Sequence, residues 1–497
     1  MNFRRPDEAT GGSAAAPRSI GTRAVGNAAM LLVARVASRA IALVTVFATA
    51  NELLPARNGE FQATVTYIAL ISIMVDLGFN TLYTREGARD PEQIPHYLRS
   101  VLSTRAVFAV PALAVLAVTM WLSGFQSLLV PAFVVMLLSA YSNVLRSTFY
   151  ALGTLSFEAY AILAESLVLL GGTLFGVLTH RGIDFFLWSY AASYGFSCGY
   201  FVAVLTARRM VTWRWEFDLS FLRAWLPRSL PFALAFVITT LYFKIDQPIL
   251  LHFRGLTEVG WYTFAYKPVE ALLFVPITLL NVAFPVLAVY HSESRARLLA
   301  ATTRFYRVLL GLGWPLSVGT VMLAPGINGL FDRSAQHQFG PAAGALQILG
   351  AGIFLMFTTN AFIAALNAMN RQVLFSGAAA VSLVVNVALN IFLIPAYGFR
   401  GAAWATNLTE LALLLTGWLM VRRVLGSVPI ARVSWRILLA GLLMGGALFF
   451  FFRDAHGWLV LLAILAGMVV YGGGLLLFRA IEPEELALAR RAILRRD

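Results

Sequence analysis

Long apolar segments recur along almost the whole chain, and they limit its possible folds more than any other feature of the sequence. Each is close to the ~20 residues that a helix needs to cross the hydrocarbon core of a bilayer. Hydrophobic residues make up 59% of the 497 positions and charged residues 12%, which leaves too much apolar surface for a soluble fold to bury. The sequence therefore predicts an all-α integral membrane protein with about 14 transmembrane helices. The predicted spans are 26–50, 61–83, 101–122, 128–149, 158–179, 184–206, 229–251, 260–287, 305–330, 341–366, 373–395, 401–421, 435–452 and 458–478.

Basic residues are spread unevenly over the connecting segments. Most of the 38 Lys and Arg fall in segments on the same side as the N-terminal tail, including 85–105, 208–228 and Arg146. The opposite loops hold only Arg57, Arg181, Arg254, Arg333, Arg400 and Arg453. This is the positive-inside pattern, so both termini are predicted to be cytoplasmic. The net charge of +14 is then explained by membrane topology, and nucleic acid is excluded as a partner.

A weak internal repeat divides the chain into two sets of six helices. Gly59 in NGEF resembles Gly260 in EVGWY, and the segments that precede the fifth and eleventh helices are also alike. Two six-helix lobes of the same orientation are therefore predicted, with a cargo site between them. The first apolar run is long and follows Arg23, as in a retained anchor. The predicted parts are a disordered cytoplasmic tail (1–25), an N-lobe (26–206), a cytoplasmic linker (207–228), a C-lobe (229–421), two further helices (435–478) and a basic cytoplasmic tail (479–497).

Four basic residues are predicted to lie inside the membrane: Arg35, Arg39, Lys244 and Lys267. Such charges usually face an aqueous cavity or a partner, because burying them in lipid is costly. Arg35 and Arg39 are four residues apart and share one helix face, beside a row of small residues that favours close helix packing. The alternative for Arg35 is that it reaches the cytoplasmic headgroups. We interpret the four cations as a binding site for an anionic cargo.

Five acids also fall within predicted helices: Asp76, Glu165, Asp246, Glu270 and Glu410. Asp246 and Glu270 are close in sequence to Lys244 and Lys267, so each is a candidate for an internal ion pair. Asp76 and Glu410 are typical of packing contacts, and Glu165 is equally a candidate for carrying a coupling ion. A buried carboxylate changes charge when it binds a proton or a cation. H⁺ and Na⁺ are therefore the candidate coupling ions.

Motifs for catalysis are missing from the sequence. The six His are scattered without metal-ligand spacing, and Cys198 is the single cysteine, so neither a metal site nor an internal disulfide is predicted. The Gly-rich YGGGLL at Tyr471 has no following Lys and Ser/Thr, as a phosphate loop requires. The chain is predicted to be a transporter without a cofactor and not an enzyme.

Seven segments of the sequence form a recognisable set: KIDQPILLHF from Lys244, EVGWYTFAYK from Glu258, FVPITLLNVAFP from Phe274, VDLGF from Val75, REGAR from Arg85, AALNAMNRQ from Ala364 and VNVALNIFLIPAYGFRGAAWAT from Val385. Together they resemble polysaccharide flippases of the multidrug/oligosaccharidyl-lipid/polysaccharide exporter superfamily. The similarity extends over roughly residues 20–425, and the order and spacing of the segments support it.

The resemblance implies a MATE-like arrangement of two six-helix lobes in a V, with the last two helices added. It implies alternating-access export of a polyprenyl-diphosphate-linked oligosaccharide, as in O-antigen and lipopolysaccharide synthesis, across a bacterial inner membrane. Membrane lipids, a polysaccharide polymerase and other assembly proteins are the implied partners. Basic residues in the first helix of relatives hold diphosphate, which matches Arg35 and Arg39, and less closely Lys244 and Lys267. A lipid II flippase, a multidrug antiporter and a non-transporting assembly scaffold are the alternatives.

Overall fold

The computed structural model describes residues 17–480, with side chains from Met30 onward, and every regular element in this range is helical. The helices are α1 (Pro17–Asp76), α2 (Phe79–Arg89), η1 (Pro91–Gln93), α3 (Ile94–Leu122), η2 (Gln126–Leu128), α4 (Leu129–Ala151), α5 (Leu155–Leu178), α6 (Ile183–Ala207), α7 (Leu219–Lys244), α8 (Asp246–Arg254), α9 (Leu256–Leu272), α10 (Phe274–Glu293), α11 (Arg295–Phe331), η3 (Ala335–His337), α12 (Ala342–Ala351), α13 (Ile353–Ala368), α14 (Gln372–Tyr397), α15 (Phe399–Val424), α16 (Ile430–Phe452) and α17 (Trp458–Leu477).

Helix α1 consists of two arms that meet at a sharp kink. Leu54 adopts a φ of 63°, and Pro55 follows it. Proline removes a backbone donor and restricts the residue before it, so the helix cannot continue straight through this point. The two arms correspond to the first two spans predicted from the sequence.

Eleven helical spans within residues 17–480 are long and apolar enough to cross a membrane. One of them, Met30–Asp76, contains both arms of α1. Helices α6 and α15 are not among the eleven but are long enough, with 25 and 26 residues. Adding them, and counting the arms of α1 separately, gives the fourteen spans that the sequence predicts.

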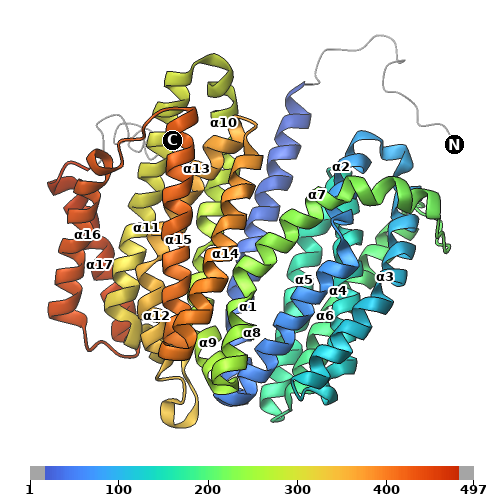
Figure 1. The fold of residues 1–497 in the computed structure, drawn as a ribbon, viewed down its shortest axis with the longest axis horizontal. Helices are drawn as coiled ribbons and strands as arrows, with labels where there is room; N and C mark the ends of the chain where they lie inside the picture. The colour runs from blue at the N-terminus through green and yellow to red at the C-terminus, as the bar shows by residue number, and fades with distance from the viewer. Residues whose placement is uncertain (1–16, 481–497) are drawn as a thin grey trace.

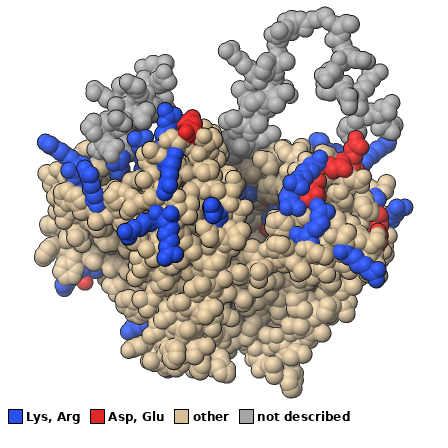
Figure 2. Space-filling view, turned by 45° about the horizontal axis from the view of Figure 1, so that its top comes forward, with Lys and Arg blue, Asp and Glu red and all other residues tan. Residues whose placement is uncertain are grey.

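The helices form two lobes that lean apart at one end (Figure 1). The N-lobe contains α1 to α6 and the C-lobe α7 to α15, while α16 and α17 pack against α11 at the outer side of the C-lobe. We call the end with α2 and the α10–α11 turn the open end. The end with the α1 kink, α8 and the start of α9 is the closed end. Figure 2 shows Lys and Arg gathered over the open end, where the surface is hollowed between the lobes.

Two glycines bring the lobes into backbone contact at the closed end. A Cβ atom at Gly59 of α1 would lie 1.9 Å from the carbonyl oxygen of Leu256, and one at Gly260 of α9 would lie 2.0 Å from that of Pro55. Only residues without a side chain allow helices to approach so closely. These are the same glycines that mark the internal repeat, so each lobe contributes an equivalent residue to the contact.

Helix α7 contacts both lobes and runs obliquely between them (Figure 1). Near its start, Trp225 stacks on Phe221 at 4.5 Å between ring centroids and lies 4.8 Å from the ring of Tyr97 on α3. At its other end, the hydroxyl of Tyr242 donates a 2.8 Å hydrogen bond to Glu410 on α15. One helix therefore connects the N-lobe to the C-lobe.

Two predicted boundaries are wrong. Helix α1 begins at Pro17, inside the segment predicted to be disordered, because proline is favourable at a first helical position. Helix α7 begins at Leu219, inside the predicted linker, because the Asp218 side chain caps it by accepting a 2.7 Å bond from the Ser220 backbone N–H. The rest of the predicted N-terminal tail, and the C-terminal tail from residue 481, lie outside the described residues.

Candidate substrate-binding cavity

A cavity of about 680 Å³ lies between the lobes, and we call it the central cavity. The first arm of α1, α4 and α5 form its N-lobe wall, while α7, α9 and α10 form its C-lobe wall. Three of the four cations predicted for the site line it: Arg35, Arg39 and Lys244. The structure thus brings together residues that are more than 200 positions apart in the sequence.

The first arm of α1 presents its arginines to the cavity because its small residues pack against α5. Ala34 is 1% exposed, and the hydroxyls of Ser38 and Ser166 are 2.6 Å apart. This close packing is what the row of small residues predicts, and it fixes the rotation of the helix. Arg35 and Arg39 then share the face that lines the cavity.

Helices α4 and α5 add a charged network to the N-lobe wall. Glu158 and Glu165 are two turns apart on one face of α5. Arg146 of α4 lies 3.1 Å from Glu158 and 2.6 Å from Glu165. Tyr150, one turn after Arg146, donates a 3.0 Å bond to Glu158 and accepts one of 2.5 Å from Arg35. Arg146 is therefore neutralised by two carboxylates, whereas Arg35 contacts only a neutral hydroxyl.

Arg146, Glu158 and Tyr150 are functional candidates that the sequence analysis missed. Arg146 was counted among the residues of a cytoplasmic segment, because it lies near the predicted end of a helix. Two spacings in the sequence could have found them. Tyr150 is four residues after Arg146, so both lie on one face of α4, and Glu158 and Glu165 are seven apart, so both lie on one face of α5.

Of the two lysines of the chain, Lys244 lines the C-lobe wall, and Lys267 of α9 is not among the lining residues. Lys267 forms the predicted ion pair with Glu270, at 2.9 Å, and Glu270 lines the cavity. The predicted pair between Lys244 and Asp246 is wrong. Side chains two residues apart on helical backbone face different sides, and Asp246 instead accepts hydrogen bonds from the Tyr262 hydroxyl and the Gln247 backbone.

Asp76 and Glu410 lie away from the central cavity. Asp76 pairs with Arg105 of α3, whose side chain is fully buried and also donates to the carbonyl of Ala140. Arg105, which the sequence analysis assigned to the cytoplasmic side, therefore lies inside the N-lobe. Glu410 lines a separate pocket within the C-lobe.

The central cavity has more cations than its own acids neutralise. Four basic side chains line it, with three acidic ones, and two of those acids are occupied by Arg146. Across the part of the chain that the structure describes, Arg35, Arg39 and Lys244 have no carboxylate within salt-bridge distance. Cations that have no direct ion pair, in a low-dielectric slot, bind an anion with several charges most favourably.

Residues 208–218 form the connector between the lobes, outside the membrane-spanning segments. Glu216 holds this connector to the N-lobe. Its carboxylate lies 2.7 Å from Nδ1 of His96 and pairs with Arg99, both on α3. The hydrogen bond from Arg99, assisted by the contact with His96, lowers the pKa of Glu216 below its ordinary value. This ionised group anchors the segment that leads into α7.

Comparison with protein families gives two adjoining matches. A family described as "Polysaccharide biosynthesis protein" matches residues 24–291. A family described as "Lipid II flippase MurJ" matches residues 270–472. No curated protein matches the chain in sequence.

Solved membrane transporters share the fold. "Lipid II flippase MurJ, inward closed conformation" is 16% identical, with a TM-score of 0.72 over 92% of this chain and 99% of that one. An inward-facing multidrug resistance MATE family transporter of the MOP superfamily is 15% identical, with a TM-score of 0.63 over 78% and 94%. A MOP superfamily transporter from Pyrococcus furiosus is 17% identical, with a TM-score of 0.54 over 81% and 94%. These likenesses establish the predicted MATE-like, two-lobe architecture.

Proposed function

Because the chain belongs to the polysaccharide biosynthesis protein family, we propose that it flips a polyprenyl-diphosphate-linked oligosaccharide from the cytoplasmic to the periplasmic leaflet. The matched families and structures are of transporters and not of enzymes. The precursor serves cell-surface polysaccharide synthesis, of which O-antigen and lipopolysaccharide are examples.

The observation that carries this proposal is the set of unpaired cations in the central cavity. A diphosphate presents several oxygens and at least two negative charges, and guanidinium groups bind such oxygens in pairs. Arg35 and Arg39 supply two guanidinium groups on one helix face, with Lys244 on the opposite wall. A cation carried by a multidrug antiporter is repelled by the same arrangement, and a non-transporting scaffold has no use for it.

Alternating access follows from the two-lobe arrangement. The headgroup enters at the open end, while the polyprenyl tail stays in the lipid beside the cavity. Separation of the Gly59–Gly260 contact then opens the other end. A membrane potential that is negative inside assists outward movement of an anion by ~2.3 kcal/mol per charge per 100 mV. Coupling to H⁺ or Na⁺ adds to this driving force.

The basic surface supports an orientation for the protein. Lys and Arg gather over the open end (Figure 2), and the positive-inside rule places such an end in the cytoplasm. Both termini then face the cytoplasm of a bacterial inner membrane. A polysaccharide polymerase and other assembly proteins are the proposed partners on the periplasmic side.

A lipid II flippase of cell-wall synthesis is the second candidate. The match to the lipid II flippase family over residues 270–472, and the shared fold over most of the chain, favour it. Lipid II has the same diphosphate and polyprenyl groups, so the central cavity suits both cargoes. The difference lies in the sugar beyond the diphosphate.

Transport in proteoliposomes tests the proposal. The purified protein is reconstituted with undecaprenyl-diphosphate-linked oligosaccharide or with lipid II, and a membrane-impermeant glycosidase or lectin reports sugar that reaches the other leaflet. Faster flipping of the oligosaccharide supports the proposal, and faster flipping of lipid II supports the second candidate. Flipping of neither lipid rejects the transport of both.

A further inference from the structure

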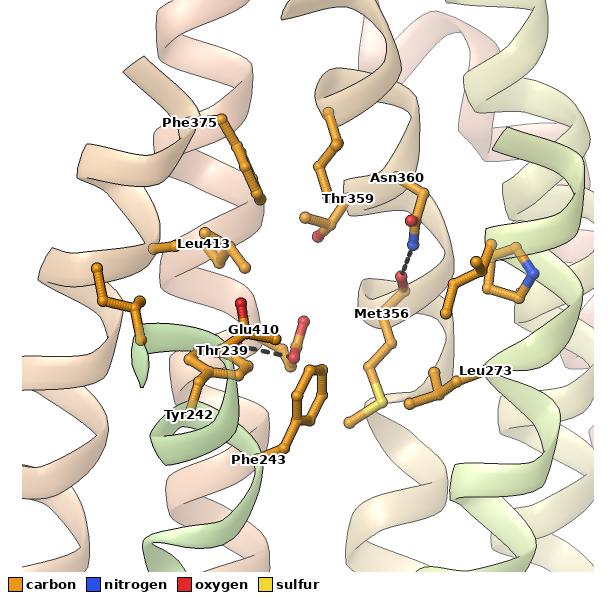
Figure 3. Close-up of a pocket in the computed structure, with 15 residues that line it drawn as sticks. Thr239, Tyr242, Phe243, Leu273, Met356, Thr359, Asn360, Phe375, Glu410 and Leu413 are labelled. Carbon is orange, nitrogen blue, oxygen red and sulfur yellow. Dashed lines mark hydrogen bonds between the residues drawn. The ribbon is translucent and has the colours of Figure 1, made fainter. Parts of the chain in front are cut away.

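Glu410 lies in a second, smaller pocket inside the C-lobe. The pocket has a volume of about 180 Å³ and is lined by side chains of α7, α10, α13, α14 and α15. Figure 3 shows Tyr242 bonded to the Glu410 carboxylate, with Phe243, Leu273 and Leu413 around them. Glu410 is only 6% exposed, so its carboxylate is separated from bulk water.

Glu410 differs from most intramembrane acids of the chain because no cation faces it. Asp76 is paired with Arg105, Glu158 and Glu165 with Arg146, and Glu270 with Lys267. Within residues 30–480, the side-chain partner of Glu410 is the neutral hydroxyl of Tyr242, at 2.8 Å. A buried carboxylate without a partner is costly, so such a group takes up a proton or a cation.

Few titratable groups surround Glu410. Tyr242 of α7 bonds to it, and Tyr266 of α9 interacts with it electrostatically. Asp246 of α8 lies nearer the closed end and is bonded to Tyr262. Helices α10, α13 and α14 contribute side chains without a titratable group to the pocket. The charge at this position is therefore set by Glu410 itself.

The walls of the pocket favour a proton over a metal cation. Ten of its fifteen lining residues are apolar. Besides Tyr242 and Glu410, the lining polar side chains are those of Thr239, Thr359 and Asn360, and each donates a 2.8 Å hydrogen bond to a carbonyl of its own helix. A cation such as Na⁺ needs a shell of oxygen ligands, as hard cations do, whereas a proton needs only the carboxylate.

Helix α7 connects this pocket to the central cavity. Thr239, Phe243, Leu273 and Ile277 line both spaces. Tyr242, which bonds to Glu410, is two residues before Lys244, which lines the central cavity. The start of α7 packs on the N-lobe through Trp225 and Tyr97. A change at Glu410 therefore acts on the helix that joins the two lobes.

We propose that Glu410 is the proton-binding site that couples flipping to a proton gradient, with Tyr242 as its latch on α7. This inference rests on the proposed flippase function. When Glu410 is ionised, it accepts a charge-assisted hydrogen bond from Tyr242, which holds α7 against α15. When Glu410 takes up a proton, Tyr242 keeps its own proton and the bond weakens to one between neutral groups. Helix α7 is then released to move with the N-lobe.

Flipping in proteoliposomes, measured with and without an imposed pH gradient at zero membrane potential, tests the coupling. The readout is the ratio of the two rates, which does not depend on how much active protein is present. For one coupled proton, a gradient of about one pH unit changes the ratio by up to about tenfold. We expect the ratio to fall to one in Glu410→Gln and to be reduced in Tyr242→Phe. The matched control Thr359→Val, in the same pocket, keeps the wild-type ratio.

Three results overturn the inference: a wild-type ratio of one, an unchanged ratio in Glu410→Gln, or a response to a sodium gradient in place of a pH gradient. A second measurement separates this inference from the flippase proposal. Infrared titration of the purified protein without substrate follows the carboxylic acid C=O band, which Glu410→Gln should remove. If that band titrates but no lipid-linked sugar is flipped, the proton site stands and the flippase function fails. If no band is lost, the proton site itself is rejected.

Discussion

The two walls of the central cavity carry positive charge in different ways. On the N-lobe wall, Arg35, Arg39 and Arg146 are the cations, and two of them take part in a network with Tyr150 and two glutamates. On the C-lobe wall Lys244 is the lining cation and is unpaired, while Glu270, which also lines this wall, is paired with Lys267. Arginine presents a planar fork that matches phosphate oxygens in pairs, whereas lysine is a flexible point charge. We infer that the N-lobe wall fixes the orientation of the diphosphate and that the C-lobe wall adds attraction without fixing it.

Loss of Arg39 should have the largest effect. It is exposed to the cavity and has no carboxylate within salt-bridge distance in the described structure, so its hydrogen-bond donors are available to a cargo. A hydrogen bond to a charged group contributes about 1.5–3 kcal/mol, so Arg39→Gln should slow flipping about 10- to 100-fold. Arg39→Lys should recover only part of the rate, because a point charge replaces a fork.

Arg453→Gln is the control for the change at Arg39, because Arg453 is exposed at the closed end and away from the cavity. Flipping is measured in proteoliposomes with matched amounts of inserted protein. Normal flipping by Arg39→Gln removes Arg39 from the mechanism. Loss of the folded protein assigns it to packing instead, and the site then shifts to Arg35, Lys244 and Lys267.

Substitutions at Gly59 and Gly260 test whether the two lobes contribute equally to the contact at the closed end. Gly59→Ala places a Cβ against the Leu256 carbonyl and Gly260→Ala places one against Pro55, so both should prevent the closed end from packing as it does here. Overpacking costs about 1–3 kcal/mol, so the melting temperature in detergent should fall and flipping should slow by up to about tenfold. Gly171→Ala, where a Cβ meets nothing within 4 Å, is the control. If only one of the two variants has an effect, the lobes do not contribute equally to this contact.

The sequence predicts the parts of the site that depend on one helix, and it fails where several helices meet. The stripe of Arg35 and Arg39, its row of small neighbours, and the Lys267–Glu270 pair all follow from helical spacing. The role of Arg146 depends on α4 and α5 being side by side, which the sequence does not specify. The Lys244–Asp246 pair was wrong because side chains two residues apart on helical backbone face different sides, and Ile245 between them keeps helical dihedrals.

Lys244 tests the difference between the walls directly. If lysine adds attraction without fixing the diphosphate, Lys244→Gln should raise KM for the lipid-linked sugar by about 3- to 10-fold and leave kcat nearly unchanged. Arg39→Gln should lower kcat as well. Equal losses in both parameters for the two variants would show that the walls play the same role.

The smallest effect is expected for the connector. A substitution there tests whether ion pairing holds the segment that leads into α7 to the N-lobe. Arg99 and His96 lower the folded-state pKa of Glu216, so its pairing stabilises the protein above the ordinary pKa of a glutamate and is lost as the pH falls through the lowered value. Glu216→Gln should therefore lower the melting temperature at pH 7 but not near pH 3. An exposed ion pair contributes at most about 1 kcal/mol, so the difference at pH 7 is small.

Asp454→Asn, which changes an exposed acid at the closed end, is the control. If Glu216→Gln lowers the melting temperature equally at both pH values, the contribution does not come from its charge, and the connector is held to the N-lobe by packing alone.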